Sequence, residues 1–368
     1  MRSVPLSVAR RGCLPWIVGL LVLWIAPLAH AQMQGQNDPN PPDVILPEMS
    51  AVPVFSAGVA MVNAWQGGQP NLHPLVSPVG LIPIGQNWLI EGRGTFESIL
   101  IPDPSGPGWK GYLQKEDDYF QLDYIANRYV TVSVGRYITP FGIFNERLYP
   151  VWIRNLQSDP LILPISTGPS GAGTGAMARG GFNLTPKVEL NYATYFSTEV
   201  TTSPFDSDRN WGFRTGIFLP GPRLEVGGSF QHLLQDDHSN AFGFHFAWQP
   251  TALPLDIRAE YARSSNGSGY WVESAYRLSQ VPVWRNEFRH VQVVGRMQQF
   301  YVGKVASDSL SSVNTNLCEF GLNYYFRDDI RFVSSYGRQF APEGGNQNIW
   351  TVGVTYRLAL PIGHGDFR

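Results

Sequence analysis

The segment Trp88-Leu89-Ile90-Glu91-Gly92-Arg93-Gly94-Thr95-Phe96-Glu97 decides the fold class. Taken alternately, its residues are Trp, Ile, Gly, Gly and Phe on one face and Leu, Glu, Arg, Thr and Glu on the other. Successive side chains of a β-strand point to opposite faces, so the segment predicts a strand with one apolar and one charged face. The segments Lys187–Phe196 and Leu255–Ala262 repeat this alternation.

About 14 such strands follow one another between residues 87 and 358, and their short and long connections alternate strictly. Pro220–Arg223 is a short connection and Thr139–Met177 is the longest. Because Greek-key crossings scramble connection lengths, the alternation favours an up-and-down barrel. The alternation of side chains slips once, near His290, which predicts a β-bulge or a further turn.

The sequence therefore predicts an all-β fold, a transmembrane up-and-down antiparallel β-barrel of about 14 strands. If Ala57–Trp65 or part of the longest connection also pairs, the count becomes about 16, again an even number with both chain ends on the periplasmic side.

The composition favours a membrane barrel over a soluble one. Charged residues make up 15% of the 368 residues and aromatic residues 13%, yet mean hydropathy is −0.13. An apolar face in lipid and a polar face in a lumen would cancel in that mean. Water in the lumen keeps inward charges hydrated, whereas a dry core would not tolerate them. The residues predicted to line the pore are Glu91, Arg93, Arg136, Arg214, Asp256, Arg258, Glu260, Arg289, Arg296 and Arg331.

The chain begins with a predicted signal peptide, residues 1–31. Basic residues precede the apolar run Ile17–Ala26, and Ala29-His30-Ala31 matches a cleavage site. A transmembrane helix is the competing interpretation, but that run is shorter than the roughly 20 residues needed to cross a bilayer. After the signal peptide we expect a Pro-rich, largely irregular periplasmic segment at 32–86, the transmembrane barrel at 87–358 and a C-terminal tail at 359–368.

Cofactors and nucleic acid are not expected. Export removes Cys13 and leaves Cys318 as the one cysteine, so no disulfide within the chain, cysteine-rich metal site or haem-attachment motif is predicted. Asp236-Asp237-His238 lies in a polar stretch that is typical of a hairpin tip rather than a metal site. A net charge of −2 argues against nucleic-acid binding.

The longest connection, Thr139–Met177, is predicted to fold into the lumen. Its aromatic and aliphatic residues, among them Phe144, Tyr149 and Trp152, are too apolar for a loop left in water. A loop inside a pore narrows it and sets the charge of the constriction. The charged residues predicted for that constriction are Glu146, Arg147 and Arg154.

The stretch Gly135-Arg136-Tyr137-Ile138-Thr139-Pro140-Phe141-Gly142 resembles the strand-to-loop motif G-[QR]-[FY]-x-x-P-F-[GS] of the phosphate-selective porin O/P family. The resemblance implies a bacterial outer-membrane porin. In that family a ladder of arginines and a lysine cluster give an anion preference, and neither has a residue-by-residue match in this sequence. The resemblance therefore implies a porin without specifying its solute.

The leading hypothesis is an outer-membrane porin through which small hydrophilic or anionic solutes diffuse passively. Its expected partners are outer-membrane lipid and those solutes, and both a monomer and a homo-oligomer (trimer) stay open. One alternative is a structural barrel whose 32–86 segment docks a periplasmic partner. An outer-membrane barrel enzyme is less favoured, since His232 and His238 are not accompanied by a G-x-S-x-G run. We therefore predict a protein that is not an enzyme.

Overall fold

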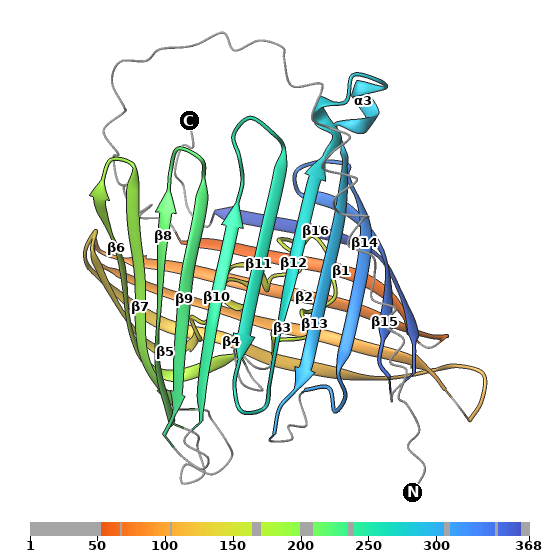
Figure 1. The fold of residues 1–368 in the computed structure, drawn as a ribbon, viewed down its shortest axis with the longest axis horizontal. Helices are drawn as coiled ribbons and strands as arrows, with labels where there is room; N and C mark the ends of the chain where they lie inside the picture. The colour runs from red at the N-terminus through yellow and green to blue at the C-terminus, as the bar shows by residue number, and fades with distance from the viewer. Residues whose placement is uncertain are drawn as a thin grey trace, which may run out of the picture. The chain divides into compact units, whose positions relative to one another are not determined.

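The computed structural model describes residues 53–66, 68–103, 105–163, 171–198, 209–234, 239–304, 310–342 and 345–361. Within them, antiparallel strands β1 to β16 form one closed barrel, in which β16 pairs with β1 (Figure 1). The all-β barrel prediction is confirmed with its alternative count of 16 strands, because the stretch Ala57–Trp65 pairs as part of β1. The strands are β1 (Val54–Gln66), β2 (Gln69–Ile84), β3 (Trp88–Pro102), β4 (Trp109–Asn127), β5 (Val130–Ile138), β6 (Ala172–Thr185), β7 (Val188–Thr198), β8 (Arg209–Leu219), β9 (Leu224–Leu233), β10 (Asn240–Trp248), β11 (Leu255–Arg263), β12 (Gly267–Arg277), β13 (Val291–Val302), β14 (Thr315–Tyr325), β15 (Ile330–Phe340) and β16 (Gln347–Pro361).

The two faces of the barrel wall differ in the way that the alternation predicts. On β4, Phe120 is 67% exposed on the outer face, whereas its neighbour Gln121 is buried. On β13, Arg296 is buried on the inner face and Met297 is exposed on the outer one. Large apolar side chains that are exposed around a closed barrel indicate a lipid-facing surface, because in water they would be costly.

Residues 54–66 and 69–84 are barrel wall, not part of an irregular segment as the sequence predicted for 32–86. The prolines of this stretch suggested irregular structure, since proline cannot donate a hydrogen bond to a neighbouring strand. Pro74 and Pro78 have Cα partners on β1 but none on β3, and the same holds for the preceding His73 and Ser77, so the ladder between β2 and β3 is interrupted around these two prolines. Residues 1–52, with the predicted signal peptide, lie outside the described residues.

The last strand also runs further than predicted. The sequence placed the end of the barrel at Leu358, but β16 continues to Pro361 because Val54 and Phe55 of β1 need partners there. The rest of the predicted tail, residues 362–368, lies outside the described residues.

The predicted strict alternation of short and long connections is not observed: three residues join β11 to β12, fewer than the six that join β10 to β11, and 13 residues join β12 to β13. Between β12 and β13 the chain forms a 3₁₀ turn, η3 (Leu278–Gln280), and a single helical turn, α3 (Arg285–Phe288). The slip near His290 is therefore a further turn and not a β-bulge. In the part of the chain that the structure describes, no helix is long and apolar enough to span a bilayer.

Candidate functional site

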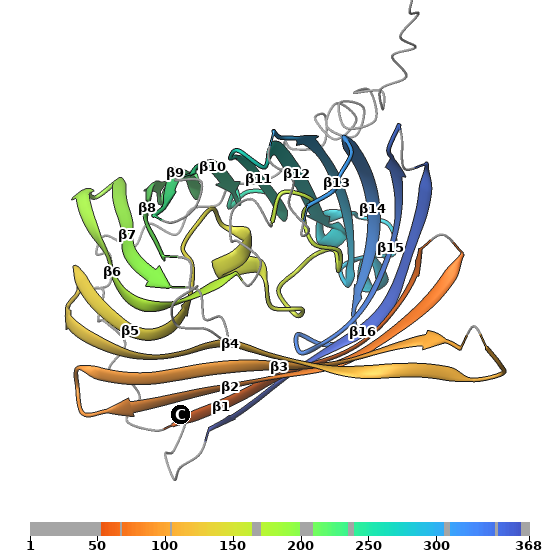
Figure 2. The same ribbon diagram turned by 90° about the horizontal axis from the view of Figure 1, so that it is seen from below.

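The connection from β5 to β6 leaves the wall and fills part of the lumen (Figure 2). Its base is tied together by Asn145, whose Nδ2 donates to the carbonyl oxygens of Thr139 (3.1 Å) and Gly171 (2.7 Å). Gly142 has a φ of 65°, and a Cβ there would lie 1.5 Å from Oε1 of Glu260. The glycine of the Pro-Phe-Gly motif thus permits the chain to turn against the opposite wall. We call residues 139–163 the inner loop.

Backbone groups of the inner loop bind polar side chains of β8, β9 and β11. The Gly142 N–H donates to Oγ of Ser229 at 3.0 Å, and its carbonyl oxygen accepts from Nη1 of Arg214 at 3.2 Å. The Phe144 N–H donates to Oε2 of Glu260 at 3.3 Å. Buried backbone groups need such partners, so the inward polar residues of these strands hold the loop in place.

Two ion pairs join the loop to the same wall. The short π-helical turn η2 (Phe144–Leu148) carries both charged residues. Glu146 lies 2.9 Å from Nη1 of Arg214, and Arg147 binds Glu225 through both Nη atoms, at 2.6 and 2.9 Å. Burial works against the charged form of Arg147, but the hydrogen bonds and charge of Glu225 outweigh it and raise the pKa of the guanidinium. Arg147 therefore stays charged.

The second half of the loop is anchored to β12, β13 and β14. Asn155 donates to Oε1 of Glu273 at 2.9 Å, and the Leu161 N–H donates to Oε1 of Gln298 at 2.9 Å. Arg296 donates to the carbonyl oxygen of Ser158 at 2.7 Å and forms an ion pair of 2.7 Å with Glu319. The side chains of that ion pair are each 1% exposed, so water does not separate loop from wall here.

Apolar side chains of the second half complete this packing. Val151 joins a cluster with Ala60 and Val62 of β1, and Leu156 packs with Ala275 and Val294. Further along, Ile162 belongs to a larger cluster that includes Phe144, Trp271 and Phe300. This part of the lumen is therefore filled like the core of a soluble protein.

On the β4–β9 side, two arginines of the lumen keep contact with water, although their carboxylate partners are more buried. Arg179 of β6 lies 3.1 Å from Asp123 and 3.4 Å from Glu91, and its side chain is 36% exposed. Arg147 of the loop is likewise 36% exposed, although Glu225 binds it. We call the part of the lumen that the exposed sides of these two arginines face the passage.

Eight of the ten residues predicted to line the pore lie on the inner face of the barrel. Each of them has at least one polar partner, either in the inner loop or among other side chains of the inner face. The eight are Glu91, Arg93, Arg214, Asp256, Arg258, Glu260, Arg296 and Arg331.

Arg136 instead lies on the outer face. It has the parity of the exposed residues Val132 and Val134, and its Cα partner is the outward Phe120. The prediction placed Arg136 on the inner face, but the inward positions of β5 are taken by Ser133 and Tyr137, both fully buried. Near the strand end, Nε of Arg136 donates to the Asp117 carbonyl oxygen at 2.7 Å.

Arg289 is not in the wall at all. It follows α3 in the connection between β12 and β13, is exposed, and its carbonyl oxygen accepts from Nε of Arg277 at 2.9 Å. Of the three loop charges, Glu146 and Arg147 lie in the lumen as described. Arg154 pairs with Asp159 of the same loop at 2.6 Å.

Two inward residues were missed from the sequence. Arg179 lies just beyond Met177, the predicted end of the longest connection. Because residues two apart share a face of a strand, Arg179 points the same way as the buried Met177 of β6. Asp118 is the extra residue at a register shift opposite Arg93 and Gly94, where simple alternation fails. Of the enzyme candidates, His232 binds Oδ1 of Asn240 at 2.7 Å, and His238 lies outside the described residues.

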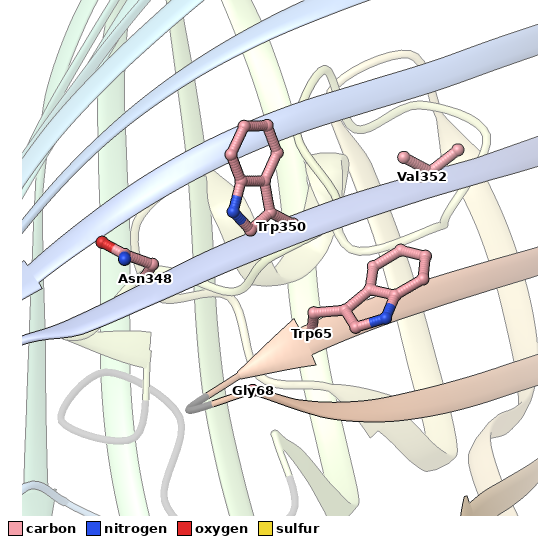
Figure 3. Close-up of a pocket in the computed structure, with 5 residues that line it drawn as sticks. All are labelled: Trp65, Gly68, Asn348, Trp350 and Val352. Carbon is pink, nitrogen blue, oxygen red and sulfur yellow. The ribbon is translucent and has the colours of Figure 1, made fainter.

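A hollow on the outer face is separate from the passage. Trp65, Gly68, Asn348, Trp350 and Val352 line it at the seam of β1 and β16 (Figure 3). Trp65 and Trp350 are Cα partners and are 37% and 51% exposed. Outward tryptophans near strand ends are typical of the aromatic girdles of membrane barrels.

Comparison with solved structures identifies the architecture. The chain resembles OmpF of Salmonella typhi at 10% identity, covering 84% of this chain and 98% of that one with a TM-score of 0.61. It resembles OprB of Pseudomonas putida, in the high-pH structure, at 8% identity and a TM-score of 0.57, covering 84% of this chain and 93% of that one. The chain has the fold of the outer-membrane porins. The predicted location in the outer membrane agrees with this fold and with the apolar outer face.

No family model and no curated protein matches the sequence. At 8–10% identity the solved structures establish the porin fold alone, and the solute is not transferred from them.

Proposed function

We propose that this porin-fold chain is a passive outer-membrane channel for small hydrophilic solutes. The observation that supports it best is the contrast across the wall, with apolar side chains exposed outside and partly exposed, paired arginines inside. The inner loop supports it further, because a loop that fills part of a lumen leaves a passage of restricted width. Diffusion through such a passage needs no chemical step.

The lining of the passage favours solutes of either sign. The sequence resemblance to phosphate-selective porins would imply an anion preference. However, Arg147 and Arg179 each have carboxylate partners, so neither offers an isolated positive charge. Selectivity would then follow mainly from width, with only a modest effect of charge.

We propose that outer-membrane lipid surrounds the barrel. Whether the protein is a monomer or a trimer can be measured. Trimer and monomer differ threefold in channels per particle, so conductance steps in groups of three would support a homotrimer. The docking hypothesis needs residues 32–86 as the segment that contacts a periplasmic partner. Residues 54–66 and 69–84 of that segment instead form β1 and β2 of the barrel.

The test is the conductance of purified, folded protein in planar bilayers. We expect stepwise increases of current that scale with salt concentration and need no energy source. Heat-denatured protein is the control and should give no steps. If folded, heat-modifiable protein inserts into bilayers without conducting, the channel function is wrong.

A further inference from the structure

A column of alternating aromatic and arginine side chains runs through the inner loop from one wall to another. Each guanidinium lies over the rings on both sides of it, at distances of 4.8 to 5.6 Å from Cζ to the ring centroid. The last step is an edge-on contact of two rings whose centroids are 6.0 Å apart. In order, the members are Tyr119, Arg93, Tyr149, Arg154, Phe144 and Trp271.

The two ends of the column stand on opposite walls. Tyr119 belongs to β4 and Trp271 to β12. In the closed order of the barrel, seven strands separate β4 from β12 in either direction. A chain of contacts between these strands therefore crosses the lumen rather than following its wall.

Carboxylates neutralise both arginines of the column. Nε of Arg93 donates to Asp118 at 2.7 Å, and both side chains are 5% exposed. Arg154 pairs with Asp159 at 2.6 Å and donates through Nε to the Tyr149 carbonyl oxygen at 2.6 Å. The arginines can thus stack on the rings without an unpaired charge in the lumen.

Tyr149 is the link between wall and loop. Its ring contacts Arg93 on β3 and Arg154 on the loop, and its hydroxyl donates to Oε2 of Glu116 on β4 at 3.4 Å. Without this side chain, none of these contacts would join the column's loop members to its members on β3 and β4.

The two sides of the column differ. On the side of β13 to β16, the second half of the loop is buried against the wall, with Leu156 2% and Ile162 1% exposed. On the β4–β9 side, the side chains of Arg147 and Arg179 remain partly exposed.

We infer that the column is a partition that confines the solute path to the β4–β9 side, and that Tyr149 sets its width. This rests on the proposed channel function, which it deepens by naming the residue that limits solute size. Tyr149 is a positioning residue here, since it acts by holding the loop across the lumen.

The first test replaces Tyr149 by Ala and by Phe. Tyr149→Ala removes the link, so single-channel conductance should rise roughly twofold and liposomes should admit sugars that wild type excludes, because pore width governs passage. Tyr149→Phe keeps the ring and should resemble wild type in both measurements. If wild type conducts and Tyr149→Ala has unchanged conductance and size limit, the partition is wrong while the channel function stands.

The second test does not depend on conduction. In a Cys318→Ser background, Arg179→Cys places a thiol on the inner face of β6, where the arginine side chain is 36% exposed, and Ser335→Cys places one on the inner face of β15, where Ser335 is 8% exposed. A charged methanethiosulfonate reagent should label the first thiol at least about tenfold faster, since the thiolate reacts only where it is accessible. Equal rates would overturn the partition whether or not the protein conducts. A non-conducting protein that keeps the rate difference would overturn only the channel function.

Discussion

Two sides of the barrel both present charged side chains to the lumen, but they differ in how far the inner loop buries these side chains. On the β4–β9 side, the side chains of Arg147 and Arg179 are each 36% exposed while paired with carboxylates. On the β12–β14 side, Arg296 and Glu319 make the same kind of pair at 1% exposure. The strand alternation is the same on both sides, so the difference comes from the second half of the inner loop.

The difference shows that a charged strand face does not by itself define a pore. Where water remains, an ion pair is worth little to stability and a charge can act on passing solutes. Where the loop displaces water, the same residues become buried groups that depend on their partners. The inner face of this barrel should therefore respond to mutation like a protein core on one side and like a protein surface on the other.

The largest expected effect separates these two responses. Arg296→Ala leaves Glu319 and Glu273 without their cation and removes a donor to the Ser158 carbonyl oxygen. Breaking a buried pair by removing one partner costs about 3–5 kcal/mol, and we expect a loss of that size in the free energy of unfolding. Denaturant titration of the refolded barrel in detergent micelles measures it.

Arg179→Ala is the matched control for that measurement. It also removes an arginine from two carboxylates, but from an ion pair that is partly exposed to water. Because Asp123 is only 2% exposed, part of the penalty for an unpaired buried charge remains, and we expect a cost of about 1–2 kcal/mol, below that of Arg296→Ala. Similar losses for the two variants would mean that the two sides of the lumen are equally hydrated.

Sequence alternation was sufficient for the wall and insufficient for the interior. Trp88–Glu97 predicted which side chains of β3 face the lumen, because the period of two follows from local geometry. Pro74 and Pro78 made β2 unrecognisable in the sequence. A strand tolerates proline only where the missing N–H is not needed by a neighbouring strand, and the sequence does not show which strand that neighbour is. The partners of Glu146 and Arg147 lie some 70 to 80 residues away along the chain, and no local pattern encodes such pairings.

An intermediate effect tests the outer face of the water-filled side. Val134 lies at the middle of β5 and is 55% exposed to the outside. A lysine on the lipid face near the bilayer midplane costs about 2–4 kcal/mol, so Val134→Lys should destabilise the barrel in lipid vesicles by that amount. Arg136→Leu, on the same face but at the strand end, should change the unfolding free energy by less than about 0.5 kcal/mol.

These two variants also check the corrected orientation of Arg136. If Arg136 lined the passage after all, Arg136→Leu would lower the anion permeability while leaving stability unchanged. If Val134→Lys were neutral, the outer face of β5 would be covered by something other than lipid.

The smallest expected effect is on ion selectivity, where the first half of the inner loop borders the passage. Arg147→Gln leaves the charge of Glu225 without its cation and should shift the permeability ratio toward cations, whereas Glu146→Gln leaves Arg214 and should shift it toward anions. A unit charge about 8 Å from a permeating ion in water is worth about 0.5 kcal/mol, which corresponds to a change of roughly twofold. The reversal potential in a salt gradient measures it, and Arg289→Gln, in the exposed turn after α3, should leave it unchanged. The opposite signs are the critical feature, because a general loosening of the loop would move both variants in the same direction. Wild-type reversal potentials for both loop variants would mean that ions do not pass beside η2, and the water-filled side of the lumen would then have to lie elsewhere.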